Sequence, residues 1–507
     1  SLNVVYPEDN KTAKKDLYVI VENESEMTGK FAGYSYYLKD NFVIPETKTL
    51  KVSTGLDVGN VKGLTNITYE NTGDKQTVAL RTNSGKLTVN AEKDVVYHYG
   101  NASEVYVQKV DKDSYHEYGT VDLLTVEYGH VDVATNGKIT TMVVAPTSAD
   151  AVTVTAEENQ IESVVAKGEN AASVVESITK DTGATTIAYG DSSTFSNSDY
   201  FAGKSLQKNL YLTMNQDISL IDGFEPITLA IPSIKLILDL NGKKLDINGF
   251  AIKNTCELMI LDSIGTGEIY FHGKWSMNGI QFEYEGGIVT LNGGTLYANS
   301  EYTANGYGSI VFMRNGTTFI MNGGKLVSNN TEHDEGSLAV YMYDPNVKFI
   351  MNGGEIEKTA GTVGAIMASG SSNVKNKTVI EINGGSIKSN TVAIYHPQNG
   401  TLKVNGGYIE GETAVYVKSG TIELNDGELK ATANAYSNYQ YLGDGCHMTG
   451  DALVIDACGY SGGNPVVTIN GGKYTTTASG AHGIAHYKYN GNFAMITNNT
   501  NIEVFGA

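Results

Sequence analysis

The chain has 507 residues, with 57 Gly, 32 Tyr and 8 Pro, and a formal net charge of −20 at pH 7. Neutralising phosphates requires clustered Lys and Arg, so this acidity argues against a nucleic-acid partner, and Arg81 and Arg314 are the chain's two arginines. No run of about twenty apolar residues occurs, which excludes a membrane-spanning helix. The first residues lack the pattern of a secretion signal, which leaves open whether a signal was removed or the protein was made in the cytosol.

Three cysteines, Cys256, Cys446 and Cys458, are too few and too scattered for a disulfide framework or a zinc site. We expect buried free thiols, and a bridge between Cys446 and Cys458 is the alternative. We predict no cofactor. Calcium is conceivable on so acidic a surface, but no spacing of carboxylates indicates a site for it.

Residues 1–59 are predicted to form a cap or attachment module, because the open end of a stack of strands exposes unpaired backbone groups. Short alternating runs such as TVALRTNSGKLTVN and TVDLLTVEYGHVDV follow. They predict a first, less regular β-helical stretch over residues 60–166, with a β-sandwich as the rival. Residues 167–204 are expected to contain one short helix, over 167–184, and a Ser-rich linker.

The remaining residues, 205–507, contain a repeat. Asn-Gly-Gly recurs at Asn292, Asn322, Asn352, Asn383, Asn405 and Asn470, with Asn425-Asp426-Gly427 as a variant. The shortest spacing, 425 − 405 = 20 residues, is too short for a strand–helix–strand unit but fits one coil of a parallel β-helix. The fold class expected is therefore all-β, a right-handed parallel β-helix solenoid.

Alternation within each repeat predicts which side chains face inward. Apolar residues two apart precede each Asn, as Phe349 and Met351 precede Asn352. The Asn-Gly-Gly is a turn, because Asn and Gly tolerate the left-handed backbone conformation that such a corner needs. Stacked coils would place the Asn side chains above one another, where their amides form a hydrogen-bonded ladder. We assign the Asn column a structural role.

A second strand in each repeat has a middle position that is expected to point outward. These positions are Val311, Tyr341, Met367, Tyr395, Tyr416 and Ala485. Together they predict an exposed apolar stripe, a feature that often marks a partner surface. Tyr341, Tyr395 and Tyr416 are the candidate ligand- or partner-binding residues, although ordinary β-propensity also explains tyrosine in strands. Insertions at 297–308, 328–337, 358–364 and 369–377 are expected to build a binding face.

The motif LDLNGKKL, the repeated NGG and GDALVIDACGYSGGNPVVTINGG, at 450–472, resemble right-handed parallel β-helix surface proteins of gut Firmicutes and of their phages. These proteins belong to the pectate-lyase-like solenoid superfamily. The resemblance extends over about residues 205–507. It implies attachment at a cell surface or on a virion.

Many right-handed β-helices cut pectin-like glycans, so we looked for a catalytic site. Lyase chemistry needs carboxylates that hold calcium beside a Lys or Arg base, and hydrolysis needs paired carboxylates. The aligned strands show no compact Asp cluster at outward positions, and Arg314 stands alone beside a turn. We therefore predict that the protein is not an enzyme.

The densest polar cluster comprises Asp444, His447, Asp451 and Asp456. It could be a calcium or glycan site, but a loop that closes a coil is the favoured interpretation. His333, Asp334 and Glu335 are expected to be solvated on an insertion. His396 and His486 fall at inward strand positions and are expected to be structural.

The leading functional hypothesis is a non-enzymatic protein, extracellular or at the cell surface, that adheres to a glycan or host-surface receptor. The first alternative is a phage tail or head fibre on a virion, in which the apolar stripe packs in a homo-oligomer, such as a trimer. The second alternative is a polysaccharide lyase or glycoside hydrolase.

Overall fold

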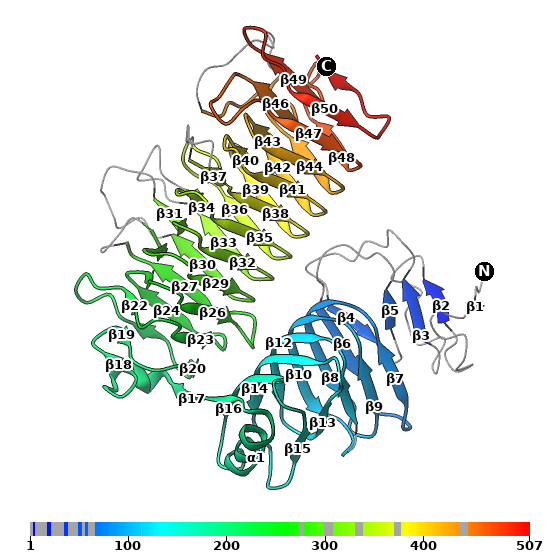
Figure 1. Ribbon diagram of the computed structural model, residues 1–507, viewed down its shortest axis with the longest axis vertical. Helices are drawn as coiled ribbons and strands as arrows, with labels where there is room; N and C mark the ends of the chain where they lie inside the picture. The colour runs from blue at the N-terminus through cyan, green and yellow to red at the C-terminus, as the bar shows by residue number, and fades with distance from the viewer. Residues whose placement is uncertain are drawn as a thin grey trace. The chain divides into compact units, whose positions relative to one another are not determined.

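The computed structural model describes residues 66–112, 114–273, 278–298, 308–329, 338–369, 377–435 and 445–506, and five short strands among the first 58 residues. The chain forms two compact units, Ser1–Tyr189 and Gly190–Ala507 (Figure 1). Strands dominate both units. The one α-helix in these ranges is α1 (Ala172–Thr182), which lies inside the segment predicted to be helical. None of the described helices has the length and apolarity of a membrane span.

The first unit is built from two sheets, A and B, and from β3 to β16 successive strands belong alternately to sheet A and sheet B. Sheet A consists of β1 (Val4–Val5), β2 (Tyr18–Val21), β3 (Ser35–Leu38), β5 (Leu56–Val58), β7 (Thr77–Leu80), β9 (Val95–His98), β11 (Tyr115–Glu117), β13 (Gly129–Val133) and β15 (Val152–Thr155). Sheet B consists of β4 (Thr49–Val52), β6 (Asn66–Glu70), β8 (Ser84–Asn90), β10 (Ala102–Lys109), β12 (Thr120–Val126), β14 (Lys138–Val144), β16 (Ile161–Ala166) and β17 (Thr185–Asp191).

Parallel pairing identifies the first unit as a solenoid. Leu87 pairs with Val105, and Val105 pairs with Leu124 in the next coil, so each coil lies directly on the one before it. A β-sandwich would instead be built from antiparallel strands. The predicted β-helical stretch is confirmed. β2, β3 and β5 extend sheet A and β4 extends sheet B, so the pairing continues across residue 59.

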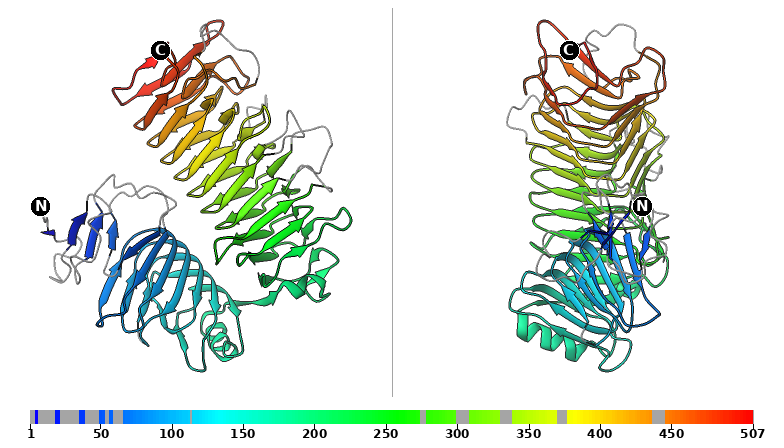
Figure 2. Two further views of the ribbon diagram at one scale, coloured as in Figure 1. Left: turned by 180° about the vertical axis from the view of Figure 1, so that it is seen from behind. Right: turned by 90° about the vertical axis from the view of Figure 1, so that its right-hand side faces the viewer.

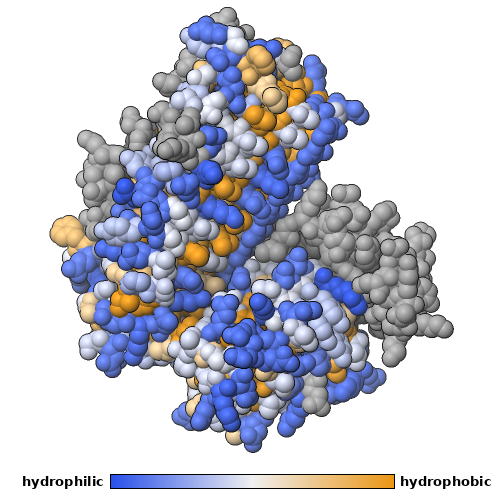
Figure 3. All heavy atoms as spheres, viewed as in Figure 1, coloured by the Kyte–Doolittle hydropathy of each residue, from blue (hydrophilic) through white to orange (hydrophobic). Residues whose placement is uncertain are grey.

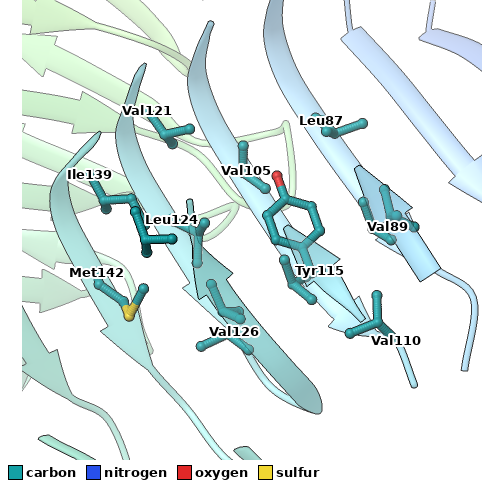
Figure 4. Packing of buried hydrophobic residues seen from close by; sticks show 14 of the residues in the cluster. Leu87, Val89, Val105, Val110, Tyr115, Val121, Leu124, Val126, Ile139 and Met142 are labelled. Atoms are coloured by element: carbon teal, nitrogen blue, oxygen red, sulfur yellow. The ribbon is translucent and has the colours of Figure 1, made fainter. Parts of the chain in front are cut away.

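The core of the first unit lies between sheets A and B (Figure 4). Rows of branched side chains such as Leu87, Val105 and Leu124 point into it and are almost fully buried. Helix α1 packs Val175 and Ile178 against the same core. This packing covers apolar surface beside β16 that would otherwise face water.

The second unit has three sheets, and from β20 to β49 each coil supplies one strand to each in the order C, E, D. Figure 2 shows the stacked coils from two further sides. Sheet C contains β20 (Leu210–Thr213), β23 (Lys235–Asp239), β26 (Glu257–Leu261), β29 (Ile288–Leu291), β32 (Thr318–Met321), β35 (Lys348–Met351), β38 (Val379–Ile382), β41 (Thr401–Val404), β44 (Thr421–Leu424), β47 (Val466–Ile469) and β50 (Met495–Asn498). Sheet E contains β21 (Ile218–Ser219), β24 (Lys244–Ile247), β27 (Glu268–Phe271), β30 (Thr295–Ala298), β33 (Lys325–Ser328), β36 (Glu355–Lys358), β39 (Ser386–Ser389), β42 (Tyr408–Gly411), β45 (Glu428–Ala431) and β48 (Lys473–Thr476).

Sheet D is the third sheet of the second unit. It contains β18 (Phe201–Ala202), β19 (Ser205–Leu206), β22 (Ile227–Leu229), β25 (Phe250–Ile252), β28 (Ile280–Phe282), β31 (Ser309–Met313), β34 (Leu338–Met342), β37 (Ile366–Ala368), β40 (Val392–His396), β43 (Thr413–Val417), β46 (Leu453–Ala457), β49 (Ile484–Lys488) and β51 (Val504–Phe505). Its strands are parallel except at β18 and β19. The predicted parallel β-helix is confirmed.

The Asn column forms the predicted ladder at the corner between sheets C and E. Each Nδ2 donates to the Oδ1 of the Asn one coil earlier, at 2.7–3.0 Å, from Asn322 through Asn499. Asn499 was not predicted to belong to the ladder, because it is followed by Thr500-Asn501 and not by Gly-Gly. The second Gly of each turn has a positive φ, as at Gly407 (+87°), and a Cβ there would lie 2.9 Å from the Gly385 carbonyl oxygen. Glycine is therefore required both by conformation and by space.

The insertions lie in the chain next to strands of sheet D. Residues 299–307, 330–337 and 436–444 connect strands of sheet E to strands of sheet D, and 370–376 connects sheet D to sheet C. These segments lie outside the described residues. The predicted insertion 358–364 is described and connects β36 of sheet E to β37 of sheet D. That the insertions build a binding face stays a prediction. His333, Asp334, Glu335 and Asp444 lie in them.

Candidate functional site

The outward row of sheet D is the row that the sequence singled out, with one correction. The strand pairing aligns Phe312, Tyr341, Met367, Tyr395, Tyr416, Val454 and Ala485. Val311 was predicted to belong to this row, but it pairs with Val340 and is fully buried inside the coil. The error is a slip of one residue, which turns every side chain of a strand to the other face.

Three aromatic rings form a partly exposed group at the β31–β34 end of this row, which we call the aromatic platform: Phe312, Tyr341 and Tyr343. Phe312 and Tyr341 are half-buried neighbours on adjacent strands, with ring centroids 5.6 Å apart. Tyr343, 44% exposed, has its centroid 5.3 Å from Phe312 and 5.6 Å from Tyr341. The predicted exposure of Tyr341 is thus partly right.

The rings of the platform are inclined to one another rather than stacked. The interplanar angles are 65° between Phe312 and Tyr341, 75° between Tyr341 and Tyr343, and 31° between Phe312 and Tyr343. Aromatic rings that meet edge to face leave part of a ring face turned away from the pair. A planar ligand can approach such a face.

An ion pair borders the platform. Arg314 Nε donates to Asp344 Oδ2 at 2.9 Å, and the Arg314 guanidinium carbon lies 5.7 Å from the centroid of the Tyr343 ring. The Arg314 side chain is 39% exposed, and its guanidinium carries further N–H donors besides Nε. Arg314 had been expected to stand alone beside a turn, and this is wrong, because Asp344 approaches it from the next coil.

The other surface aromatic groups differ in geometry. Tyr270 and Tyr297 stack at 4.6 Å with an interplanar angle of 12°, and Lys244 lies over the Tyr270 ring. In the first unit Tyr97 stacks on His116 at 4.6 Å and 10°. In each pair the two ring faces lie against each other across adjacent strands, which stabilises the stack of coils.

Farther along the row, the prediction that the side chains form an exposed stripe is wrong. Tyr395 is 3% exposed and Tyr416 is 0% exposed, and Ala485 is buried with them. Two segments, 445–451 and 458–463, cover this part of sheet D. Cys446 packs against the tyrosines, and the His447 ring lies 6.3 Å from that of Tyr416. Burial raises the pKa of Tyr395, as does its hydrogen bond with Tyr460.

The polar cluster of the long insertion is divided between separate partners. Asp451 accepts hydrogen bonds from the His482 backbone N–H, at 2.8 Å, and from the Tyr487 hydroxyl, at 2.9 Å. Asp456 accepts from the Tyr416 hydroxyl at 2.8 Å and pairs with Lys418. Each carboxylate is thus bound within the cover of sheet D, in line with a loop that closes a coil.

His396 and His486 point inward, as predicted. Burial lowers the pKa of each imidazole to about 4. His486 Nε2 accepts a hydrogen bond from the Ala494 backbone N–H at 3.0 Å, which requires that this nitrogen carry no proton. Both histidines are therefore neutral core residues.

The cysteines are free thiols, and Cys256 is buried. Burial raises the pKa of both Cys446 and Cys458 to about 11, so neither is an activated nucleophile. Within the described ranges, no group of three or more His, Cys, Asp or Glu side chains could hold a metal ion.

Sequence reasoning missed Phe312, Tyr343 and Asp344. A signal was present for Tyr343: in Tyr341-Met342-Tyr343 the tyrosines are two residues apart and so share a face of the strand and its continuation.

Comparison with known proteins adds no relative. No protein-family description matches the chain, and neither a curated protein nor a solved structure is significantly similar to it.

Proposed function

We propose that the protein is a non-enzymatic, extracellular or cell-surface solenoid that adheres to carbohydrate through the aromatic platform. The observation that carries this proposal is the group of three inclined, partly exposed rings beside the Arg314–Asp344 pair. The apolar face of a pyranose stacks on an aromatic ring, and guanidinium and carboxylate groups hydrogen-bond its hydroxyls. Both kinds of group meet at this place.

The small size of the platform, three neighbouring rings, suits a local binding site rather than a broad protein interface. On the face seen in Figure 3, hydrophilic residues predominate and apolar residues occur in small groups. Large hydrophobic patches mark permanent partner surfaces, and the covered tyrosines are no part of such a patch. A small aromatic area with a charged border suits a ligand of a few sugar units.

Direct evidence would come from a broad glycan array probed with the full chain, followed by titration of any hit against three variants. Tyr343→Ala and Tyr341→Ala each remove one platform ring, and we expect about tenfold weaker binding, equivalent to about 1.4 kcal/mol. Tyr297→Ala is the matched control, because it removes a ring of a stacked pair on sheet E. We expect it to bind like the wild type.

Several results would contradict the proposal. Equal losses in Tyr297→Ala and Tyr343→Ala would show that the effect is not specific to the platform. Release of new reducing ends or of unsaturated sugars from a polysaccharide would identify an enzyme instead. Absence of binding to every glycan, with capture of the protein by a purified receptor, would place the function in protein recognition.

A further inference from the structure

The cover of sheet D buries a lysine and an aspartate side by side. Lys418 directly follows β43, and Asp456 lies in the neighbouring strand β46. Their side chains are 0% and 1% exposed, and Lys418 Nζ lies 3.3 Å from Asp456 Oδ2. A primary amine and a carboxyl group are thus held in contact and away from bulk water.

The surroundings make this ion pair costly. The ring centroids of Tyr416 and Tyr460 lie 5.7 Å and 5.0 Å from Lys418 Nζ, so aromatic rings replace water beside the ammonium and offset only part of its lost hydration. Two charges that lose their hydration are repaid by mutual attraction only when their remaining lone pairs and protons are also bonded. Asp456 Oδ1 is buried and accepts no hydrogen bond from any residue that the structure describes. The pair would be relieved by a reaction that removes both charges.

We propose that Lys418 and Asp456 condense to form an intramolecular amide bond. The ion pair is the reactant state. A proton passes from Nζ to Oδ2, which leaves a neutral amine, the nucleophilic form of the lysine, and a carboxylic acid. The amine attacks Cγ, the Nζ–Cγ bond forms and the Cγ–Oδ2 bond breaks. Oδ2 leaves as water with two protons that came from Nζ, which keeps the third. No oxidant or other reactant is consumed.

Tyr416 is placed to assist the departure of the oxygen. Its hydroxyl donates a hydrogen bond to Asp456 Oδ2 at 2.8 Å, the same atom that approaches Lys418 Nζ. Burial and the charge of Asp456 raise the pKa of Tyr416, so the phenol remains a proton donor at neutral pH. Holding the three groups at reacting distance replaces a collision in solution by an intramolecular step.

The bond would join two coils across the longest interval of the Asn ladder. Asn425 and Asn470 are adjacent in the ladder although 45 residues separate them. An amide between residues 418 and 456 would close the intervening chain, including the cover segment 445–451, into a loop. This role does not depend on glycan binding, and its test is independent of any ligand.

The mass of the denatured full-length chain tests the proposal. We expect it to be lower by one water molecule than the mass calculated from the sequence, and a proteolytic digest should contain one branched peptide that joins residues 418 and 456. Lys418→Arg keeps the positive charge but cannot form this amide, and its mass should be the full calculated value. A full mass for the wild type overturns the proposal, and that measurement requires no variant to fold.

Two further results would also be decisive. Loss of ammonia rather than water would place the bond at Lys358, whose Nζ lies 2.7 Å from Asn390 Oδ1, and would overturn the assignment to Asp456. Tyr416→Phe removes the donor to Oδ2 while keeping the ring. A smaller cross-linked fraction than in wild-type protein of the same age would support the role of Tyr416, and an equal fraction would refute that role.

Discussion

Replacing Gly407 by Ala should destabilise the second unit much more than the same change at Gly265. Both glycines lie at the corner between sheets C and E, with φ of +87° and +91°. An added Cβ at Gly407 would lie 2.9 Å from the Gly385 carbonyl oxygen and 3.1 Å from the Gly384 carbonyl carbon. At Gly265 it would meet nothing within 4 Å. The two variants share the conformational strain and differ in the steric clash.

The expected magnitudes follow from these two contributions. A non-glycine residue in the left-handed region costs about 1–2 kcal/mol, which is the whole effect expected for Gly265→Ala. The contact at Gly407 is with the backbone of the preceding coil, which can yield only if the strands separate, and overpacking of this kind costs about 1–3 kcal/mol more. Gly407→Ala should therefore lower the free energy of unfolding by about 2–5 kcal/mol.

Urea denaturation followed by circular dichroism would measure both changes, provided that the unfolding slope is the same in each variant. The steric argument is refuted if the two alanine variants lose equal stability. A larger loss at Gly265 would mean that coil-to-coil contact at this corner is looser than the Asn ladder indicates.

Other perturbations test the ladder and the buried histidine. Asn383→Ala removes two ladder hydrogen bonds, to Asn352 and from Asn405, and should cost about 2–3 kcal/mol in urea denaturation, whereas Asn499→Ala at the exposed end should cost less than about 1 kcal/mol. Equal losses of stability in Asn383→Ala and Asn499→Ala would mean that the ladder hydrogen bonds inside the stack contribute no more than the one at its exposed end. Burial lowers the pKa of His396 from 6.5 to about 4. As the pH falls from 6.5 to 4, the unfolded chain therefore takes up a proton that the folded chain does not. The free energy of unfolding falls by up to about 3 kcal/mol over this range. His396→Val, which copies the paired Val417, should remove that part of the loss between pH 7 and pH 4.5; an unchanged pH dependence would contradict the assignment.

The regular part of the second unit was predictable because the turn that ends one strand of each coil has a recognisable sequence. Asn-Gly-Gly marks the same corner in successive coils, and the apolar residues at fixed distances from it are all buried, as Phe349 and Met351 are. Sheet D has no comparable marker. Ile310-Val311-Phe312 is apolar at all three positions, so alternation alone allows two registers, and the one chosen was wrong by one residue. The inward Met313, which decides the register, carries no local signal.

The burial of Tyr395 and Tyr416 could not be predicted for a different reason. Alternation indicates on which side of a sheet a residue lies, but not what else lies on that side. The cover comes from residues 445–451 and 458–463, which follow Tyr416 by about 30–50 positions and belong to an interval without repeat spacing. The partners of Asp451 and Asp456 were hidden for the same reason, since each is formed across coils.

One row of sheet D therefore supports two different chemistries, and what lies over the row decides between them. At β31 and β34 the rings of Phe312, Tyr341 and Tyr343 reach solvent, where a ring face and an ion pair can meet a ligand. Beside β43 and β46 the outward positions are covered, so Lys418 and Asp456 form a buried ion pair that has lost its hydration. The repeated strands determine where these side chains lie, and the non-repeated segments determine whether they are exposed or covered. Function in such a solenoid should accordingly be sought where the connections between sheets E and D lengthen, rather than in the repeated strands.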